Sequence, residues 1–220
     1  RIMTKGGKIW KWIFWIWVVL MLLLQIANLF MNGVNRGTLI IFSEFLIFVW
    51  FGFIYFLRKP LSKIIKKIPN KYLRFVVVGY LSTVVAELVY MFSHPMHRNV
   101  VWDLILTAPW YILWMALWFK ILKKYDYSLV EAFVLAGVHG LIIEGLLNSP
   151  LLALMGLPLF IALYGCFFIV PYLLMKDEFK GQKHASLWKK IKMSFVPLIA
   201  FIIGFIWIFS LVKIFGLTLH

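Results

Sequence analysis

The chain has 220 residues, of which 64% are hydrophobic and only 14% are charged. Soluble domains average about half apolar and about a quarter charged residues, so the composition excludes an ordinary soluble protein and predicts an all-α integral membrane protein. The net charge of +15 would suit nucleic acid, but the basic residues lie between apolar runs without a nucleic-acid-binding motif. We therefore expect membrane lipids, and no nucleic acid, as partners of these charges.

Apolar runs recur along the whole chain, and each is long enough to cross the hydrocarbon layer, which takes roughly 20 helical residues. They predict a bundle of about seven transmembrane helices in a single domain over residues 1–220. The first run is too long for a signal-peptide core, so we expect it to be a span. The expected spans are about 9–31, 38–57, 74–94, 101–119, 129–148, 151–175 and 194–214.

The connections between these runs differ strongly in charge. Of the 23 Lys and Arg residues, 20 lie at the N-terminus and in segments 58–74, 120–124 and 176–192. The positive-inside rule then predicts a cell-membrane protein with a cytoplasmic N-terminus and an extracytoplasmic C-terminus. Segment 58–74 also carries apolar residues at helical spacing between its lysines, which predicts a short amphipathic helix on the membrane surface.

Ionisable side chains within the predicted spans gather toward the outer side. Glu44, Glu87 and Glu144 fall in outer halves of spans, and His139 falls near the middle of the fifth. A charge facing lipid costs several kcal/mol, so we expect these groups to face the bundle interior. The candidate catalytic residues are Glu87, His139 and Glu144, and the candidate binding residues are Glu44, His94, His97, Asp103 and Asn148.

Small residues mark the helix faces that lead to two of these carboxyls. Ala132, Ala136 and Gly140 precede Glu144 at intervals of four residues, and Gly79 and Thr83 precede Glu87 in the same way. Such faces let membrane helices approach closely. A faint repeat aligns Glu87 with Glu144 and Pro109 with Pro158, which predicts parallel hairpins whose carboxyls face each other.

Three functions fit this pattern. The outward position of the ionisable groups favours a hydrolase-like intramembrane enzyme that acts on a lipid or a membrane peptide. A divalent metal ion is a possible cofactor, with His94, His139, Glu87 and Glu144 as its candidate ligands. The second function is a small proton- or cation-coupled transporter or channel that uses the same residues. The third is a non-catalytic membrane subunit whose polar residues join helices.

Two segments, GVHGLIIEGLLN and AELVY, resemble the glutamate- and histidine-rich segments of CAAX-type and PrsW-type intramembrane proteases. Those families begin from a Glu-Glu pair with a following basic residue, whereas this chain has Ala86 and Glu87 followed by Leu88. The zinc signature H-E-x-x-H and the nucleophile motif G-x-S-x-G are also absent from the sequence. No residue role is therefore transferred from this resemblance.

Overall fold

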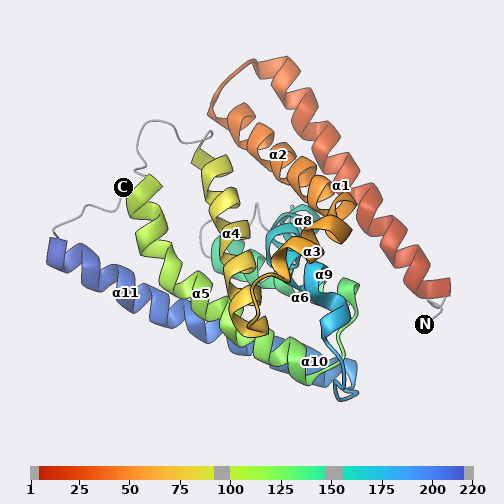
Figure 1. The fold of residues 1–220 in the computed structure, drawn as a ribbon. Helices are drawn as coiled ribbons and strands as arrows, with labels where there is room; N and C mark the ends of the chain where they lie inside the picture. Colours follow the sequence, from red (N-terminus) through yellow and green to blue (C-terminus); the bar gives the residue numbers. More distant parts are fainter. Residues whose placement is uncertain (1–4, 92–99, 147–155, 216–220) are drawn as a thin grey trace.

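The computed structural model describes residues 5–91, 100–146 and 156–215, and it confirms the all-α class (Figure 1). Apart from an isolated bridge between Tyr125 and Lys183, the regular elements of these residues are helices. The α-helices are α1 (Lys5–Asn32), α2 (Arg36–Phe56), α3 (Arg58–Ile65), α4 (Lys71–Met91), α5 (Val100–Lys124), α6 (Leu129–Gly140), α8 (Leu157–Phe168), α9 (Val170–Met175), α10 (Leu187–Ser194) and α11 (Ile199–Phe215). The shorter helical turns are η1 (Leu141–Leu146, a π-helix), η2 (Lys176–Glu178) and η3 (Val196–Leu198), the last two being 3₁₀-helices.

Five helical segments of the described residues are long and apolar enough to cross a membrane, and α8 with α9 makes a sixth if the bent pair is one span. The chain is thus a multi-pass helical protein, and its described residues contain five or six of the seven predicted spans as full-length helices. In predicted span 129–148, the apolar helix covers Leu129–Ile143 within the described residues. Residues 147–155 lie outside the described part of the chain. The five segments are Trp15–Asn32, Gly37–Phe56, Lys71–Met91, Leu104–Lys124 and Leu187–Leu211.

Local sequence explains the start of α6 and the break between α8 and α9. The Ser128 side chain accepts a hydrogen bond from the Glu131 backbone N–H, and the Glu131 side chain accepts one from the Ser128 backbone N–H. This pair of hydrogen bonds fixes the start of α6. Between α8 and α9 the chain bends by 50°. Pro171 follows this bend, and proline lacks an N–H and crowds the carbonyl four residues earlier, so it breaks a helix here.

Helix α8 lies at the centre of the bundle. It contacts α1, α2, α4 and α6, and residues 161–172 are buried without interruption. Helices α1 and α2 form a hairpin on one side of it, whereas α5 and α11 run together along the other (Figure 1). The longest uninterrupted run of buried residues in the described part of the chain therefore lies in α8 and the start of α9.

The two small-residue faces predicted from the sequence pack against different helices. On α6, a Cβ atom at Gly140, which belongs to the predicted face, would overlap the Tyr164 side chain of α8, and one at the adjacent Gly137 would overlap the Ile161 carbonyl group. On α4, a Cβ atom at Gly79 would lie 2.3 Å from the sulfur of Met115 in α5. Both faces are close-packed, as predicted, but α6 meets α8 and α4 meets α5. The aligned prolines also differ, since Pro109 lies inside α5 and Pro158 in the first turn of α8.

One end of the bundle collects the basic connections, and we call it the basic end: α3, residues 66–70, residues 125–128 and residues 176–186. The predicted amphipathic helix is present as α3, and its apolar side packs toward α9. There, the Ser62 hydroxyl donates a hydrogen bond to the Leu174 carbonyl at 2.6 Å. Backbone hydrogen bonds join residues 124–126 to Lys183 across the end. These contacts tie the basic segments to one another and to the bundle.

We expect Gly137→Ala to destabilise the protein, because the added methyl group would overlap a backbone carbonyl that cannot rotate away. Overpacking of this kind costs roughly 1–3 kcal/mol, which corresponds to a fall of about 5 °C in apparent melting temperature in detergent. Gly52→Ala is the matched control, since nothing lies within 4 Å of a Cβ atom there. Equal melting temperatures for the two variants would contradict the close contact of α6 with α8.

Candidate functional site

The predicted binding residue Glu44 lies on α2, where it is only 8% exposed. Its Oε2 atom has no hydrogen-bond partner among the described residues, and the side chain of Gln25 on α1 lies within hydrogen-bonding reach of the carboxyl group. The neighbouring Ser43 hydroxyl donates to the Val89 carbonyl on α4 at 3.1 Å. This interhelical hydrogen bond places Glu44 level with the C-terminal part of α4, within about a helical turn of Glu87.

Glu87 is half-buried on the face of α4 that meets α5. The Tyr111 hydroxyl on α5 donates a hydrogen bond to Glu87 Oε1 at 2.9 Å. Tyr111 itself is buried, and its ring lies 3.7 Å from that of Trp110. The phenol is thus held by packing, and it fixes the position of the carboxyl group. Glu44 and Glu87 form a pair of carboxyl groups at similar depth, each with an uncharged side chain beside it.

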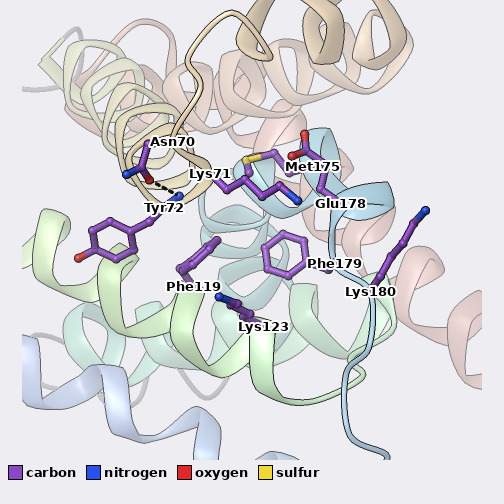
Figure 2. A pocket seen from close by; sticks show the side chains of 9 residues that line it. All are labelled: Asn70, Lys71, Tyr72, Phe119, Lys123, Met175, Glu178, Phe179 and Lys180. Atoms are coloured by element: carbon purple, nitrogen blue, oxygen red, sulfur yellow. Dashed lines mark hydrogen bonds between the residues drawn. The ribbon is translucent and has the colours of Figure 1, made fainter.

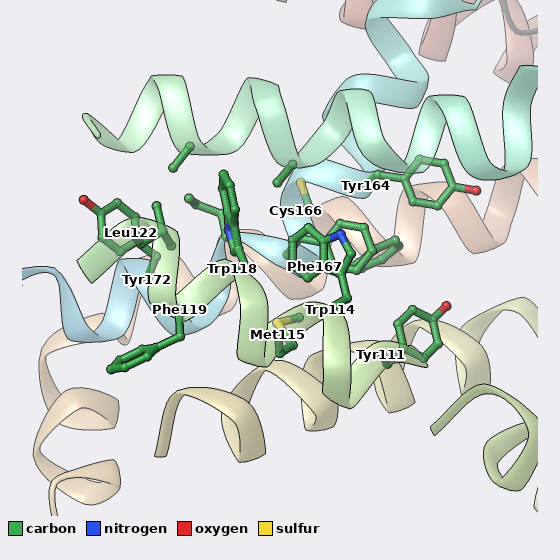
Figure 3. Packing of buried hydrophobic residues seen from close by; sticks show 14 of the residues in the cluster. Tyr111, Trp114, Met115, Trp118, Phe119, Leu122, Tyr164, Cys166, Phe167 and Tyr172 are labelled. Atoms are coloured by element: carbon green, nitrogen blue, oxygen red, sulfur yellow. The ribbon is translucent and has the colours of Figure 1, made fainter. Parts of the chain in front are cut away.

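His139 lies in the aromatic core, on α6. It is 0% exposed, and neither ring nitrogen has a hydrogen-bond partner among the described residues. Trp114 and Trp118 point from α5 toward α6 (Figure 3), and their ring centroids lie 5.6 and 5.7 Å from that of His139, in edge-to-face geometry. The two indole nitrogens also lack partners among the described residues. His139 is therefore enclosed by aromatic rings, and its predicted catalytic role remains a prediction.

The remaining predicted site residues fall where less can be said. The backbone of Glu144 lies within the π-helix η1 and that of Asp103 lies in the first turn of α5. His94, His97 and Asn148 lie outside the described residues. Within the described residues, no group of three His, Cys, Asp or Glu side chains is placed to hold a metal ion. The predicted metal site thus stays a prediction.

A polar network at the basic end was not predicted from the sequence. Lys190 of α10 is 3% exposed, and its ammonium group donates to the Asp126 carbonyl and to Glu131 Oε2, the latter at 3.0 Å. The Tyr127 hydroxyl donates to the Lys190 carbonyl at 2.8 Å. Every ammonium proton of Lys190 thus has an acceptor nearby, which is what makes a buried charge tolerable.

Three further contacts extend this network. Lys176 donates to the Tyr127 carbonyl at 2.7 Å, and Tyr172 donates to the same carbonyl. Nδ1 of His184 lies 3.1 Å from Asp126 Oδ2, and this hydrogen bond, with the nearby Lys190 ammonium, lowers the pKa of the Asp126 carboxyl group. The network therefore joins residues 125–128 to the 176–190 segment through ionised groups.

A second buried cation anchors the start of α4. Arg74 is 4% exposed, its Nε donates to the Ile68 carbonyl at 2.9 Å, and NH1 donates to Glu178 Oε1 at 2.5 Å. The sequence feature that could have indicated these ion pairs is the presence of Asp126, Glu131 and Glu178 in otherwise basic surroundings. Acidic residues in a strongly basic segment indicate ion pairs, but the sequence does not tell which lysine or arginine each one meets.

The helical secondary structure and the five or six apolar segments of membrane-spanning length define a multi-pass α-helical membrane protein. In comparisons with known proteins, the chain matches no protein-family model, no curated protein and no solved structure.

We expect His139→Leu to raise the stability of the protein. Burying polar atoms without partners costs about 1–3 kcal/mol, and leucine removes that cost while filling the space between the two indole rings. His139→Asn is the contrasting variant, because it keeps a buried polar group and leaves a cavity. In thermal denaturation in detergent, His139→Leu should therefore have a higher melting temperature than the wild type, and His139→Asn a lower one. A loss of stability in both would indicate that the imidazole nitrogens make stabilising contacts.

Lys190→Met should destabilise the protein by about 1–3 kcal/mol, because it removes the ammonium group that the Asp126 carbonyl and the partly exposed Glu131 carboxylate accept from. Lys192→Met, on the same helix, should cost less than about 1 kcal/mol, since Lys192 is exposed and lies over the Trp188 ring. Adding Glu131→Gln to Lys190→Met should restore part of the loss. Chemical or thermal unfolding in detergent measures all three. Equal effects of the two lysine variants would contradict a stabilising role for the network.

Proposed function

We propose that the protein is a small proton- or cation-coupled membrane transporter. The observation that carries the proposal is the broken hairpin at the centre of the bundle: α6 with η1, and α8 with α9. Transporters place their substrate and ion sites at discontinuous helices, because interrupted helices present backbone groups and side chains within the membrane. Irregular backbone at membrane depth is tolerated only inside protein or along a water-filled cavity. The buried position of residues 161–172 meets that condition.

The π-helix η1 supports the same function. Its wider turn interrupts the regular backbone hydrogen bonding of α6, and such segments occur often at functional sites. Glu144 belongs to η1, so the predicted acidic residue of the fifth span lies at an interruption of the helix. In this proposal Glu144 is one of the ion-coupling groups, in the segment where backbone carbonyls are also available.

Glu44 and Glu87 supply the remaining coupling groups. Both are membrane carboxyls beside an uncharged hydrogen-bonding side chain, Gln25 and Tyr111 respectively. A carboxyl group beside a hydrogen-bonding side chain at membrane depth suits a proton relay. Their similar depth, set by the bond from Ser43 to Val89, allows them to act in sequence.

The Glu87–Tyr111 pair also favours a second candidate, the hydrolase-like intramembrane enzyme. A carboxyl group and a phenol 2.9 Å apart can exchange a proton with a bound substrate as general base and acid. Glu87 is only half-buried, so a lipid or membrane peptide at the outer half of the bilayer could reach it. The two candidates use the same carboxyl group and differ in what crosses or reacts there.

Proton or cation flux in liposomes tests the proposal. Wild-type protein should dissipate an imposed proton, sodium or potassium gradient faster than empty liposomes, as followed with an enclosed dye. Glu44→Gln and Glu87→Gln should reduce the flux to the level of empty liposomes, because an amide carries no exchangeable charge. Asp177→Asn is the matched control, being the same type of change at an exposed residue of the basic end, and should retain the flux.

Wild-type liposomes that hold every gradient as well as empty ones would overturn the transport proposal. Loss of flux in Asp177→Asn as well would show that the effect does not depend on the membrane carboxyls. If flux is absent while Glu87→Gln and Tyr111→Phe change the turnover of a membrane lipid or peptide, the enzyme is the correct function.

A further inference from the structure

A pocket of about 470 Å³ opens at the basic end, between the start of α4, the end of α5 and the segment after α9. Lys71, Lys123 and Lys180 line it together with Phe119 and Phe179. Figure 2 shows the amines of Lys71 and Lys123 on opposite sides of the two phenylalanine rings, with Lys180 beyond Phe179. Three elements that are far apart in the sequence thus bring three cations to one cavity.

The charges of this pocket are unbalanced. Glu178 is the acidic residue in its lining, and its carboxylate is already bound by Arg74 at 2.5 Å. The three lysines are exposed, and none of them makes an ion pair with another residue that the structure describes. Because the Glu178 charge is neutralised by Arg74, the cavity presents a net positive charge of about three. Such a cavity favours an anionic ligand.

The floor of the pocket is apolar. The rings of Phe119 and Phe179 lie 5.6 Å apart, centroid to centroid, and Met175 beside them is buried. Tyr72 packs edge-on against Phe119 at 5.5 Å. A soluble phosphate compound would gain little from this floor, whereas the glycerol and upper acyl carbons of a lipid would bury apolar surface against it.

The position along the helices matches the headgroup region. Lys71 is the first residue of α4 and Lys123 lies in the last turn of α5, where apolar spans give way to charged connections. Aromatic and basic residues concentrate at this level of a membrane protein. Basic pockets between membrane helices bind the headgroups of anionic lipids.

We propose that this pocket is a specific site for an anionic phospholipid, whose headgroup is attracted by the positive charge of Lys71, Lys123 and Lys180 around the pocket and whose glycerol and upper acyl carbons lie on Phe119 and Phe179. The ligand chemistry, a phosphate ester, is shared by lipid headgroups and by free phosphate. The apolar floor selects the lipid. This proposal does not depend on the transport or enzyme activity.

The test uses two variants that remove the same charge. The pocket variant is Lys71→Gln, Lys123→Gln and Lys180→Gln, and the control variant is Lys63→Gln, Lys66→Gln and Lys67→Gln, which changes exposed lysines of the same end. Native mass spectrometry of the purified proteins titrated with phosphatidylglycerol or phosphatidylcholine measures lipid retention. Inorganic phosphate forms a further arm, read by competition with phosphatidylglycerol and by thermal stabilisation.

Wild-type and control proteins should retain phosphatidylglycerol in preference to phosphatidylcholine. The pocket variant should bind phosphatidylglycerol about 100-fold more weakly, since each lysine near an anionic lipid contributes roughly a factor of five. Lys123→Arg should bind as the wild type does, because it keeps the charge. The circular dichroism spectra of the Lys123→Arg variant and of the pocket variant should match the spectrum of the wild type, because the changed side chains are exposed.

Three results would overturn the proposal. Equal loss of binding in the pocket and control variants would indicate a general attraction of the basic end for anionic lipid. Stabilisation by inorganic phosphate without preference for phosphatidylglycerol would indicate a soluble anion as the ligand. Equal retention of both lipids by the wild type would show that the pocket does not select the headgroup.

Discussion

The contact of α6 with α8 is the constraint on which the rest of the bundle depends. In a bilayer the hydrophobic effect does not draw helices together, so association relies on close packing and interhelical hydrogen bonds. Gly137 brings the α6 backbone against the Ile161 carbonyl, and Gly140 leaves room for the Tyr164 ring. No side chain larger than hydrogen fits at either position without displacing α8. Once this pair is formed, α8 offers its other sides to α1, α2 and α4, which enclose it.

The polar groups of the protein divide into two kinds by how completely they are hydrogen-bonded. At the basic end, Lys190 and Arg74 are almost fully buried, and their charged groups are surrounded by acceptors, as a structural ion network requires. In the membrane interior, Glu44 Oε2 and both nitrogens of His139 have no partner within the described residues. Buried polar groups are normally paired, so an incompletely paired carboxyl group is a stronger sign of function than a saturated one. Glu44 and Lys190 are both buried, but Glu44 keeps a carboxyl oxygen without a partner among the described residues, whereas the Lys190 ammonium group has acceptors around it.

Local features of the sequence were sufficient for the helical class, for most span positions and for the amphipathic α3. They were sufficient because apolar length and helical spacing act within a few residues. The partners of the candidate residues could not be predicted in this way. Glu87 meets Tyr111, and His139 meets Trp114 and Trp118, only because of how α4, α5 and α6 pack. The π-helix η1 was not predicted either, because its sequence, LIIEGL, carries no compositional sign of a change in helix type.

The aromatic core places a condition on any ion movement through the bundle. Glu44 and Glu87 lie toward one membrane face, whereas Trp114, Trp118 and His139 form a closely packed layer between them and the basic end. A proton taken up at the carboxyls cannot pass rings that are 0% exposed without a rearrangement of that layer. The elements suited to rearrange are those already interrupted, namely η1 and the 50° bend between α8 and α9. The proposed transport would therefore require α6 and α8 to move against α5. Packing at Gly137 and the missing backbone N–H of Pro171 would set the free-energy cost of that movement.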